Sequence, residues 1–227
     1  MIPLKDDTPS SLKPFVTFSL IVACIAIFLW QRTLDVAASR RVVAALGAIP
    51  AVLLGRAHLA PDLQWVPSFV SIFTSMFLHG GWLHLAGNML FLWIYGDNVE
   101  DGMGHLRFAV FYLLCGVIAI LAQAVPDPAS PYPIIGASGA ISGVLGAYLM
   151  LFPRAKVLTL ILLPFFFTTL RLPAVVPLLL WFAVQLIGHL AVPDGASVAF
   201  RAHIGGFLAG VLFVVVFKRR DVPLFAH

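Results

Sequence analysis

Residues 136–143 of the chain read GASGAISG and place one hydroxyl, that of Ser138, at the head of an apolar run ending near Phe152. Most residues of this stretch have little or no side chain, so another helix can approach its backbone closely. Small residues are common in membrane helices, and the stretch alone does not define a site. Its role depends on which histidines the rest of the chain can bring to Ser138.

The composition is that of a membrane protein. Of the 227 residues, 61% are hydrophobic and 11% are charged, and the mean hydropathy is +1.00. A soluble domain carries about 25% charged residues, so this chain has too few charges to cover a water-facing surface. The net charge of +4 comes without a basic and aromatic patch, and we expect no nucleic-acid partner. The expected surroundings are membrane lipid.

Apolar stretches of helical length predict an all-α, polytopic membrane protein with a six-helix bundle. The fourth stretch is short for a full crossing, which places its first residue below the membrane surface. The first loop, residues 31–70, is long, and its apolar part is too short to cross, so we expect it to lie at the interface. The predicted spans are Pro14–Trp30, His84–Tyr95 with an upstream extension over Phe73–Leu78, Arg107–Val125, Ser138–Phe152, Pro173–Leu190 and His203–Phe217.

The flanking segments complete the predicted organisation. Residues 1–13 predict a short tail, residues 14–218 a single membrane domain, and residues 219–227 a second tail. With six spans, both tails lie on the side that holds most of the 14 Lys and Arg residues. The positive-inside rule then places both tails in the cytoplasm. Ser138, His84 and His203 would then lie toward the outside. As a separate expectation, the membrane is a bacterial inner membrane.

Residues 157–170 are apolar but do not have the character of a membrane helix. They are rich in β-branched and aromatic residues, and Pro164 divides them. Basic residues flank the stretch on both sides, at Lys156 and Arg171. This composition predicts a hairpin that lies along the membrane.

Polar side chains at membrane depth cost free energy, and each is therefore a candidate for function. His84 and Asn88 are four residues apart and share one face of a helix. Ser138 and His203 begin the fourth and sixth spans, and His84 begins the second. The starts of these three spans lie on one side of the membrane. A hydroxyl, a base within hydrogen-bond reach and nearby donors are what nucleophilic catalysis requires. The pattern predicts a Ser–His dyad, because no carboxylate is clearly placed to orient His203.

Two glycine pairs favour a close approach of the fourth and sixth helices. Gly139 and Gly143 form one GxxxG step, and Gly206 and Gly210 form another. If these glycines face each other, the serine hydroxyl can reach the histidine without an intervening side chain. A GxxxG step alone is also an ordinary feature of helix packing.

Three motifs in order make the chain resemble the rhomboid intramembrane serine proteases. Residues 79–88, HGGWLHLAGN, are similar to the family's HxxxxHxxxN pattern. Residues 136–139, GASG, are similar to GxSG, and residues 202–206, AHIGG, to AHxxG. With the six-span layout, the resemblance covers roughly Ser71 to the end of the chain. It implies a membrane serine endopeptidase that uses no cofactor and no metal.

The resemblance also implies a role for each candidate residue. Ser138 looks like the nucleophile and His203 like its general base. His84 and Asn88 resemble the oxyanion-binding side chains, which act beside the backbone N–H of Ser138 and the positive end of its helix. The implied substrates are transmembrane proteins with helix-destabilising residues near the cleaved bond. The glycines expected to support this arrangement are Gly136, Gly139, Gly143, Gly206 and Gly210.

One departure from the family pattern concerns the support of His203. Ser142 stands where some members carry an aromatic ring beneath the catalytic histidine, so the support of His203 has to come from elsewhere. The elements expected to admit substrate are the fifth span and the loop over residues 192–202.

Three alternative functions stay open. His79, His84 and His203 could supply three nitrogens to a zinc ion, although no HExxH motif and no nearby carboxylate base is found. The chain could be an inactive relative that binds membrane proteins, or a six-span transporter. The intact serine and histidine argue against inactivity, and no internal repeat supports a transporter.

Overall fold

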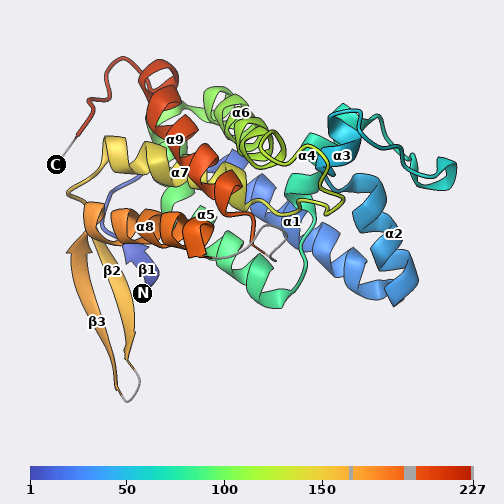
Figure 1. The fold of residues 1–227 in the computed structure, drawn as a ribbon. Coiled ribbons are helices and arrows are strands. Elements are labelled where there is room, and N and C mark those ends of the chain that lie inside the picture. The colour runs from blue at the N-terminus through green and yellow to red at the C-terminus, as the bar shows by residue number, and fades with distance from the viewer. Residues whose placement is uncertain (164–165, 192–197, 226–227) are drawn as a thin grey trace.

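The computed structural model describes residues 1–163, 166–191 and 198–225 and is mostly helical. The helices at the six predicted spans are α1 (Phe15–Thr33), α5 (Trp82–Met103), α6 (His105–Ala124), α7 (Ser138–Leu151), α8 (Val175–Ala191) and α9 (Phe200–Phe217). The short helix α7 lies at the centre and is buried along most of its length, with α5, α6, α8 and α9 around it (Figure 1). Helix α1 packs on the outer side of α5.

The described helices suit a membrane. Helices α1, α6 and α9 are long and apolar enough to cross it, and residues Pro61–Phe77 and Trp82–Met103 form a further apolar pair bent by 83°. Helices α7 and α8 are apolar but shorter, with 14 and 17 residues. The chain is therefore an integral membrane protein with a helical bundle, as predicted. That the chain crosses the membrane six times stays a prediction.

The second predicted span differs in its bounds. Its upstream extension is not continuous with α5 but forms two short helices, α4 (Ser71–Thr74) and η3 (Ser75–Phe77). At the other end α5 continues beyond Tyr95 to Met103. The glycines at positions 80 and 81 divide the two parts, since glycine disfavours a continuous helix.

The far end of α5 holds the start of α1 in place. Glu100 on α5 is completely buried and accepts the backbone N–H groups of Val16 at 2.9 Å and Thr17 at 2.8 Å. These first-turn N–H groups have no acceptor within α1, and the positive end of a helix favours a carboxylate. His105 Nδ1 lies 2.6 Å from the same carboxylate. Glu100 therefore links the end of α5 to the starts of α1 and α6.

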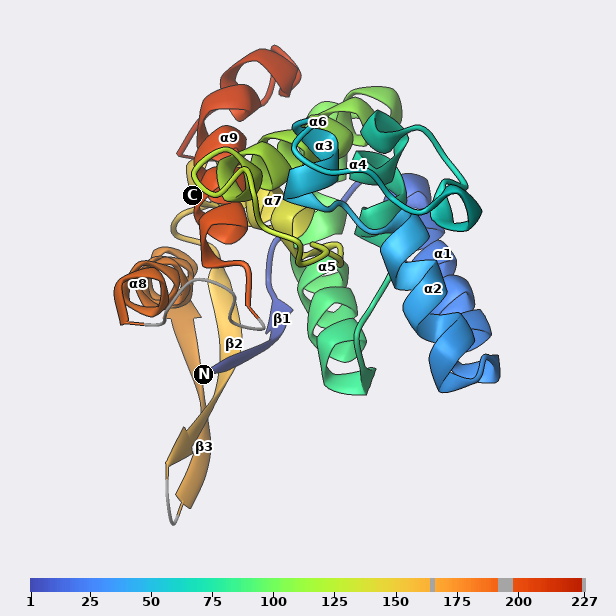
Figure 2. The ribbon, with the colours of Figure 1, turned by 45° about the vertical axis from the view of Figure 1, so that its right-hand side comes forward.

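The long first loop packs on one side of the bundle. It contains α2 (Val36–Leu46), α3 (Pro50–Leu53), η1 (Pro61–Leu63) and η2 (Ser68–Val70). Helix α2 packs on α4 and α3 packs on α6, far from the strands (Figure 2). The apolar residues expected at the interface thus form short helices, and their contact with lipid stays a prediction.

The predicted hairpin is present as β2 (Lys156–Leu163) and β3 (Phe166–Pro173), which pair antiparallel with Leu160 opposite Thr169. Its position along the membrane stays a prediction. Pro164, predicted to divide it, lies outside the described residues. A third strand, β1 (Ile2–Asp6), pairs with the other edge of β2. The stretch expected as a tail therefore contains a strand, because the edge of β2 offers unpaired backbone groups to it. The hairpin extends away from the helices (Figure 1).

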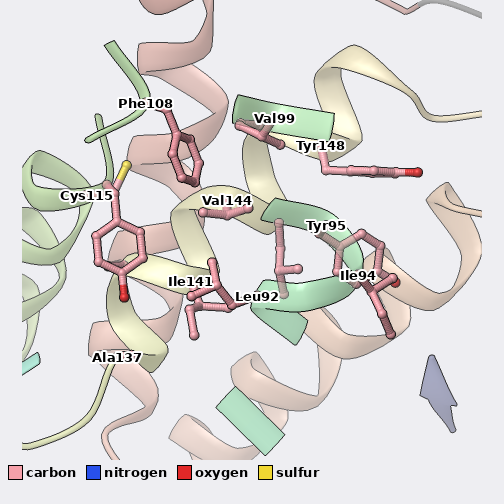
Figure 3. Packing of buried hydrophobic residues seen from close by; sticks show 14 of the residues in the cluster. Leu92, Ile94, Tyr95, Val99, Phe108, Cys115, Ala137, Ile141, Val144 and Tyr148 are labelled. Atoms are coloured by element: carbon pink, nitrogen blue, oxygen red, sulfur yellow. The ribbon is translucent and has the colours of Figure 1, made fainter. Parts of the chain in front are cut away.

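The core lies between α5, α6 and α7. Leu92 and Tyr95 of α5 pack against Ile141, Val144 and Tyr148 of α7, and all five are buried (Figure 3). The rings of Tyr95 and Tyr148 meet edge to face with their centroids 4.8 Å apart. This packing fixes the position of α7 against α5, and with it the position of Ser138 at the start of α7.

Glycines let α9 lie directly against α7. A Cβ atom added to Gly206 would collide with the carbonyl of Gly139, and one added to Gly210 would collide with that of Gly143. A Cβ on Gly143 would come within 2.5 Å of Cys115 on α6. Any larger residue would push the helices apart. The glycines therefore bring the first turns of α7 and α9 together.

Candidate active site

Ser138 is the first residue of α7 and follows a turn that requires glycine. Gly136 has a φ of +114°, a conformation that other residues rarely adopt, and a Cβ there would lie 2.6 Å from His84 Nε2. The backbone N–H of Ser138 belongs to the first turn of α7, where N–H groups have no acceptor within the helix. The hydroxyl and the N–H of this residue are therefore both available at the same end of α7.

His203 lies in the first turn of α9, and its Nε2 is 2.8 Å from Ser138 Oγ. Its other ring nitrogen, Nδ1, lies 2.8 Å from Oε1 of Gln185 on α8. Because Gln185 Nε2 donates to the carbonyl of Trp181 at 3.2 Å, the amide oxygen is the atom that faces His203. An amide oxygen only accepts, so Nδ1 carries the proton. His203 Nε2 is then free to accept the hydrogen of the Ser138 hydroxyl.

His84 and Asn88 lie on one face of α5, next to Gly136. The N–H of Gly80 donates to His84 Nδ1 at 3.4 Å, which leaves the ring proton on Nε2. A Cβ placed on Gly136 would lie 2.6 Å from this Nε2 and 3.6 Å from Asn88 Nδ2. Asn88 Nδ2 is buried and has no hydrogen-bond partner among the described residues. Two N–H donors therefore lie beside the start of α7.

These four side chains line one cavity of about 1000 Å³. Its walls come from α5 to α9 and are largely apolar, with Phe91 and Trp181 among them. Residues 198–202 of the loop expected to admit substrate also line it. Residues 192–197 of that loop, with Asp194, lie outside the described part of the chain. The cavity is large enough for an extended peptide segment and water.

The support of His203 comes from α8. Ser142 is buried and donates to the carbonyl of Ser138 at 2.6 Å. The ring of Trp181 packs near His203, with centroids 6.0 Å apart and planes at 40°. Neither Trp181 nor Gln185 was among the predicted site residues. The signal for Gln185 was present in the sequence, because it is a polar residue within an apolar span.

His79 lies behind His84, with ring centroids 5.2 Å apart. It is 2% exposed, its backbone N–H donates to Gln31 Oε1 at 3.1 Å, and its Nδ1 lies 3.2 Å from the carbonyl of Phe77. These contacts hold the turn that leads into α5. Within the described residues, no three His, Cys, Asp or Glu side chains gather to hold a metal ion.

Fold and cavity together define a helical membrane protein in which a serine and a histidine meet at two converging helix ends. The model of the rhomboid domain family matches residues 66–220, which is more than half of the chain. The chain therefore belongs to the rhomboid family.

The chain is also similar to individual rhomboid proteins. The chain is 47% identical to the rhomboid protease GluP of Bacillus subtilis over 78 residues, which are 34% of this chain and 15% of that protein. It is 33% identical to rhomboid protein 1, mitochondrial, of Saccharomyces cerevisiae over 161 residues, 66% of this chain and 42% of the relative. It is 31% identical to RHOMBOID-like protein 5 of Arabidopsis thaliana over 140 residues, 61% and 41% of the two chains. The matched parts cover less than half of each relative.

Proposed function

We propose that the protein is an intramembrane serine protease in which Ser138 is the nucleophile and His203 the general base. The supporting observation is the 2.8 Å distance between Ser138 Oγ and the unprotonated Nε2 of His203. A serine hydroxyl is a weak nucleophile and becomes effective when an adjacent base takes its proton. The relationship to a named rhomboid protease agrees with this activity.

In the first half of the reaction, Ser138 Oγ attacks the carbonyl carbon of the substrate while its proton passes to His203 Nε2. Negative charge develops on the carbonyl oxygen. The backbone N–H of Ser138, Nε2–H of His84 and Nδ2–H of Asn88 are the donors for this oxyanion. Donors already in place stabilise the transition state more than water does, because they need no reorganisation.

In the second half, the tetrahedral intermediate collapses and His203 Nε2 gives its proton to the leaving amine. The acyl group stays on Ser138 as an ester. A water molecule then loses a proton to His203 Nε2 and attacks the ester. The acid product leaves, and the proton returns to Ser138 Oγ. No metal or organic cofactor takes part in these steps.

The proposed substrates are transmembrane segments of other proteins. The carbonyl groups of a helix are already hydrogen-bonded, so a substrate helix has to unwind before its backbone can enter the cavity. Residues that weaken helices near the cleaved bond are therefore expected. The distribution of Lys and Arg supports an orientation with both termini in the cytoplasm and the cavity toward the outside.

The test is cleavage of a model transmembrane substrate in liposomes by the wild type, Ser138→Ala and His203→Ala. Ser142→Ala and His58→Ala are matched controls, because the first lies on the same helix and the second in an exposed loop. We expect both site variants to lose at least about 10³-fold in rate, while the controls retain most of it. Equal cleavage by Ser138→Ala and the wild type would reject the proposal. Sensitivity to chelators would instead favour a metal enzyme.

A further inference from the structure

Gln185 connects His203 to helix α8. Its side chain is 7% exposed, within a helix that is otherwise almost entirely apolar. Its oxygen lies 2.8 Å from His203 Nδ1, and its nitrogen donates to the carbonyl of Trp181 at 3.2 Å. Both ends of the amide therefore have a partner. We infer that Gln185 is a positioning residue that sets the tautomer and the orientation of His203, an inference that rests on the proposed function.

The tautomer decides whether the dyad can work. A neutral imidazole carries one proton, and only the form with the proton on Nδ1 leaves a lone pair on Nε2 for the Ser138 hydroxyl. In the other form, Nε2 is a donor, and Nδ1 would place its lone pair against the lone pairs of Gln185 Oε1. The hydrogen bond to Gln185 therefore favours the reactive form.

An amide suits this place in the fold. A carboxylate would hold Nδ1 as well, but a charge at membrane depth costs free energy. Gln185 accepts the same hydrogen bond without a charge. The histidine is thus held by a neutral acceptor and by the ring of Trp181, whose centroid lies 6.0 Å from that of His203.

Because Gln185 belongs to α8, the orientation of His203 depends on the position of this helix. Helix α8 lies at the edge of the bundle (Figure 1) and packs chiefly on α9. In this contact the ring of Phe182 stacks on that of Phe207 with centroids 4.5 Å apart. Much of the surface of α8 is open, since Val184 is 53% and Ile187 is 64% exposed. A displacement of α8 would take the acceptor away from His203. The dyad is therefore correctly oriented only while α8 is docked.

Two substitutions at the same position separate the hydrogen bond from packing. Gln185→Met keeps the length of the side chain without an acceptor, whereas Gln185→Glu keeps an oxygen in place. We expect Gln185→Met to lower kcat by about 10- to 100-fold with little change in KM. The rate of Ser138 labelling by a fluorophosphonate should fall in parallel. In Gln185→Glu, both kcat and the labelling rate should stay close to those of the wild type. Thermal unfolding of each variant is measured alongside.

A second measurement does not depend on protease activity. Nitrogen NMR of histidine-labelled protein in micelles reports the tautomer of His203, with its signals assigned by their loss in His203→Gln. We expect the Nδ1–H form in the wild type and a mixture of forms in Gln185→Met. An unchanged tautomer together with wild-type kcat in Gln185→Met overturns the role of Gln185, even if Ser138 proves essential. Cleavage that does not need Ser138 rejects the proposed function, while the NMR result still decides what Gln185 does.

Discussion

His203 Nε2 lies 2.8 Å from Ser138 Oγ, although 65 residues separate the two in the chain. The contact follows from the way α9 rests on α7 through glycine. Gly206 faces the backbone carbonyl of Gly139, with no room for a side chain between them. The geometry of the proposed dyad therefore depends on residues that carry no chemistry of their own.

Substitution of Gly206 by alanine should separate the two helices. Because the added Cβ would collide with the carbonyl of Gly139, we expect the free energy of unfolding to fall by about 1–3 kcal/mol. The labelling rate of Ser138 should fall as well. Gly87→Ala is the control, since a Cβ there meets no atom within 4 Å. Equal stability of the two variants in denaturant unfolding would contradict the close approach.

Asn88→Ala should lower activity without lowering stability. Its Nδ2 has no partner among the described residues, so its loss leaves no broken hydrogen bond. Loss of one oxyanion donor should lower kcat by about 10²–10³-fold. Asn98→Ala should lower stability and leave kcat almost unchanged, because Asn98 Nδ2 donates to the carbonyl of Thr8 at 3.0 Å, away from the cavity. Wild-type kcat in Asn88→Ala would exclude Asn88 from the oxyanion site.

Glu100→Ala should loosen the start of α1. The carboxylate accepts hydrogen bonds from Val16 and Thr17, and we expect a loss of about 2 kcal/mol in unfolding free energy. Hydrogen exchange at these two amides should become faster. Asp62→Asn, in an exposed pair with Arg41, should change stability by less than about 1 kcal/mol. Unchanged protection of the two amides would show that Glu100 does not hold α1.

Asp6 in strand β1 should make stability depend on pH. Burial raises the pKa of Asp6 above its ordinary value of 3.8, although hydrogen bonds from Tyr148 and Thr8 partly oppose this. The folded form therefore binds the proton more tightly than the unfolded form. The stabilisation that this gives is complete below 3.8 and is lost as the pH rises through the folded pKa.

Asp6→Asn tests this dependence, because its amide oxygen can still accept from Tyr148, whose hydroxyl lies 2.6 Å from the carboxylate. We expect the variant to gain stability relative to the wild type as the pH is raised from acidic to neutral. Unfolding curves at several pH values measure the difference. A gap between the two proteins that does not change with pH would show that Asp6 titrates normally.

Local sequence patterns were sufficient to locate the main helices, although the bounds of α5 differ from the predicted ones. The run after Ser138 predicted a short helix ending near Phe152, and α7 ends at Leu151. The β-branched residues of 157–170 predicted a hairpin, which is present as β2 and β3. These features depend on hydropathy and on residue shape, which act over a few neighbouring residues.

Contacts between distant segments were not predictable in this way. Strand β1 exists because β2 offers it an edge, and the last part of α5 carries Glu100, whose contact is with the start of α1. In the same way, Gln185 is only one polar residue of an apolar helix until α8 packs beside α9. Its hydrogen bond to His203 depends on the rotation and depth of α8, which packing between helices decides. The motifs thus indicate the candidate reactive groups, and the tertiary structure decides which residues hold His203.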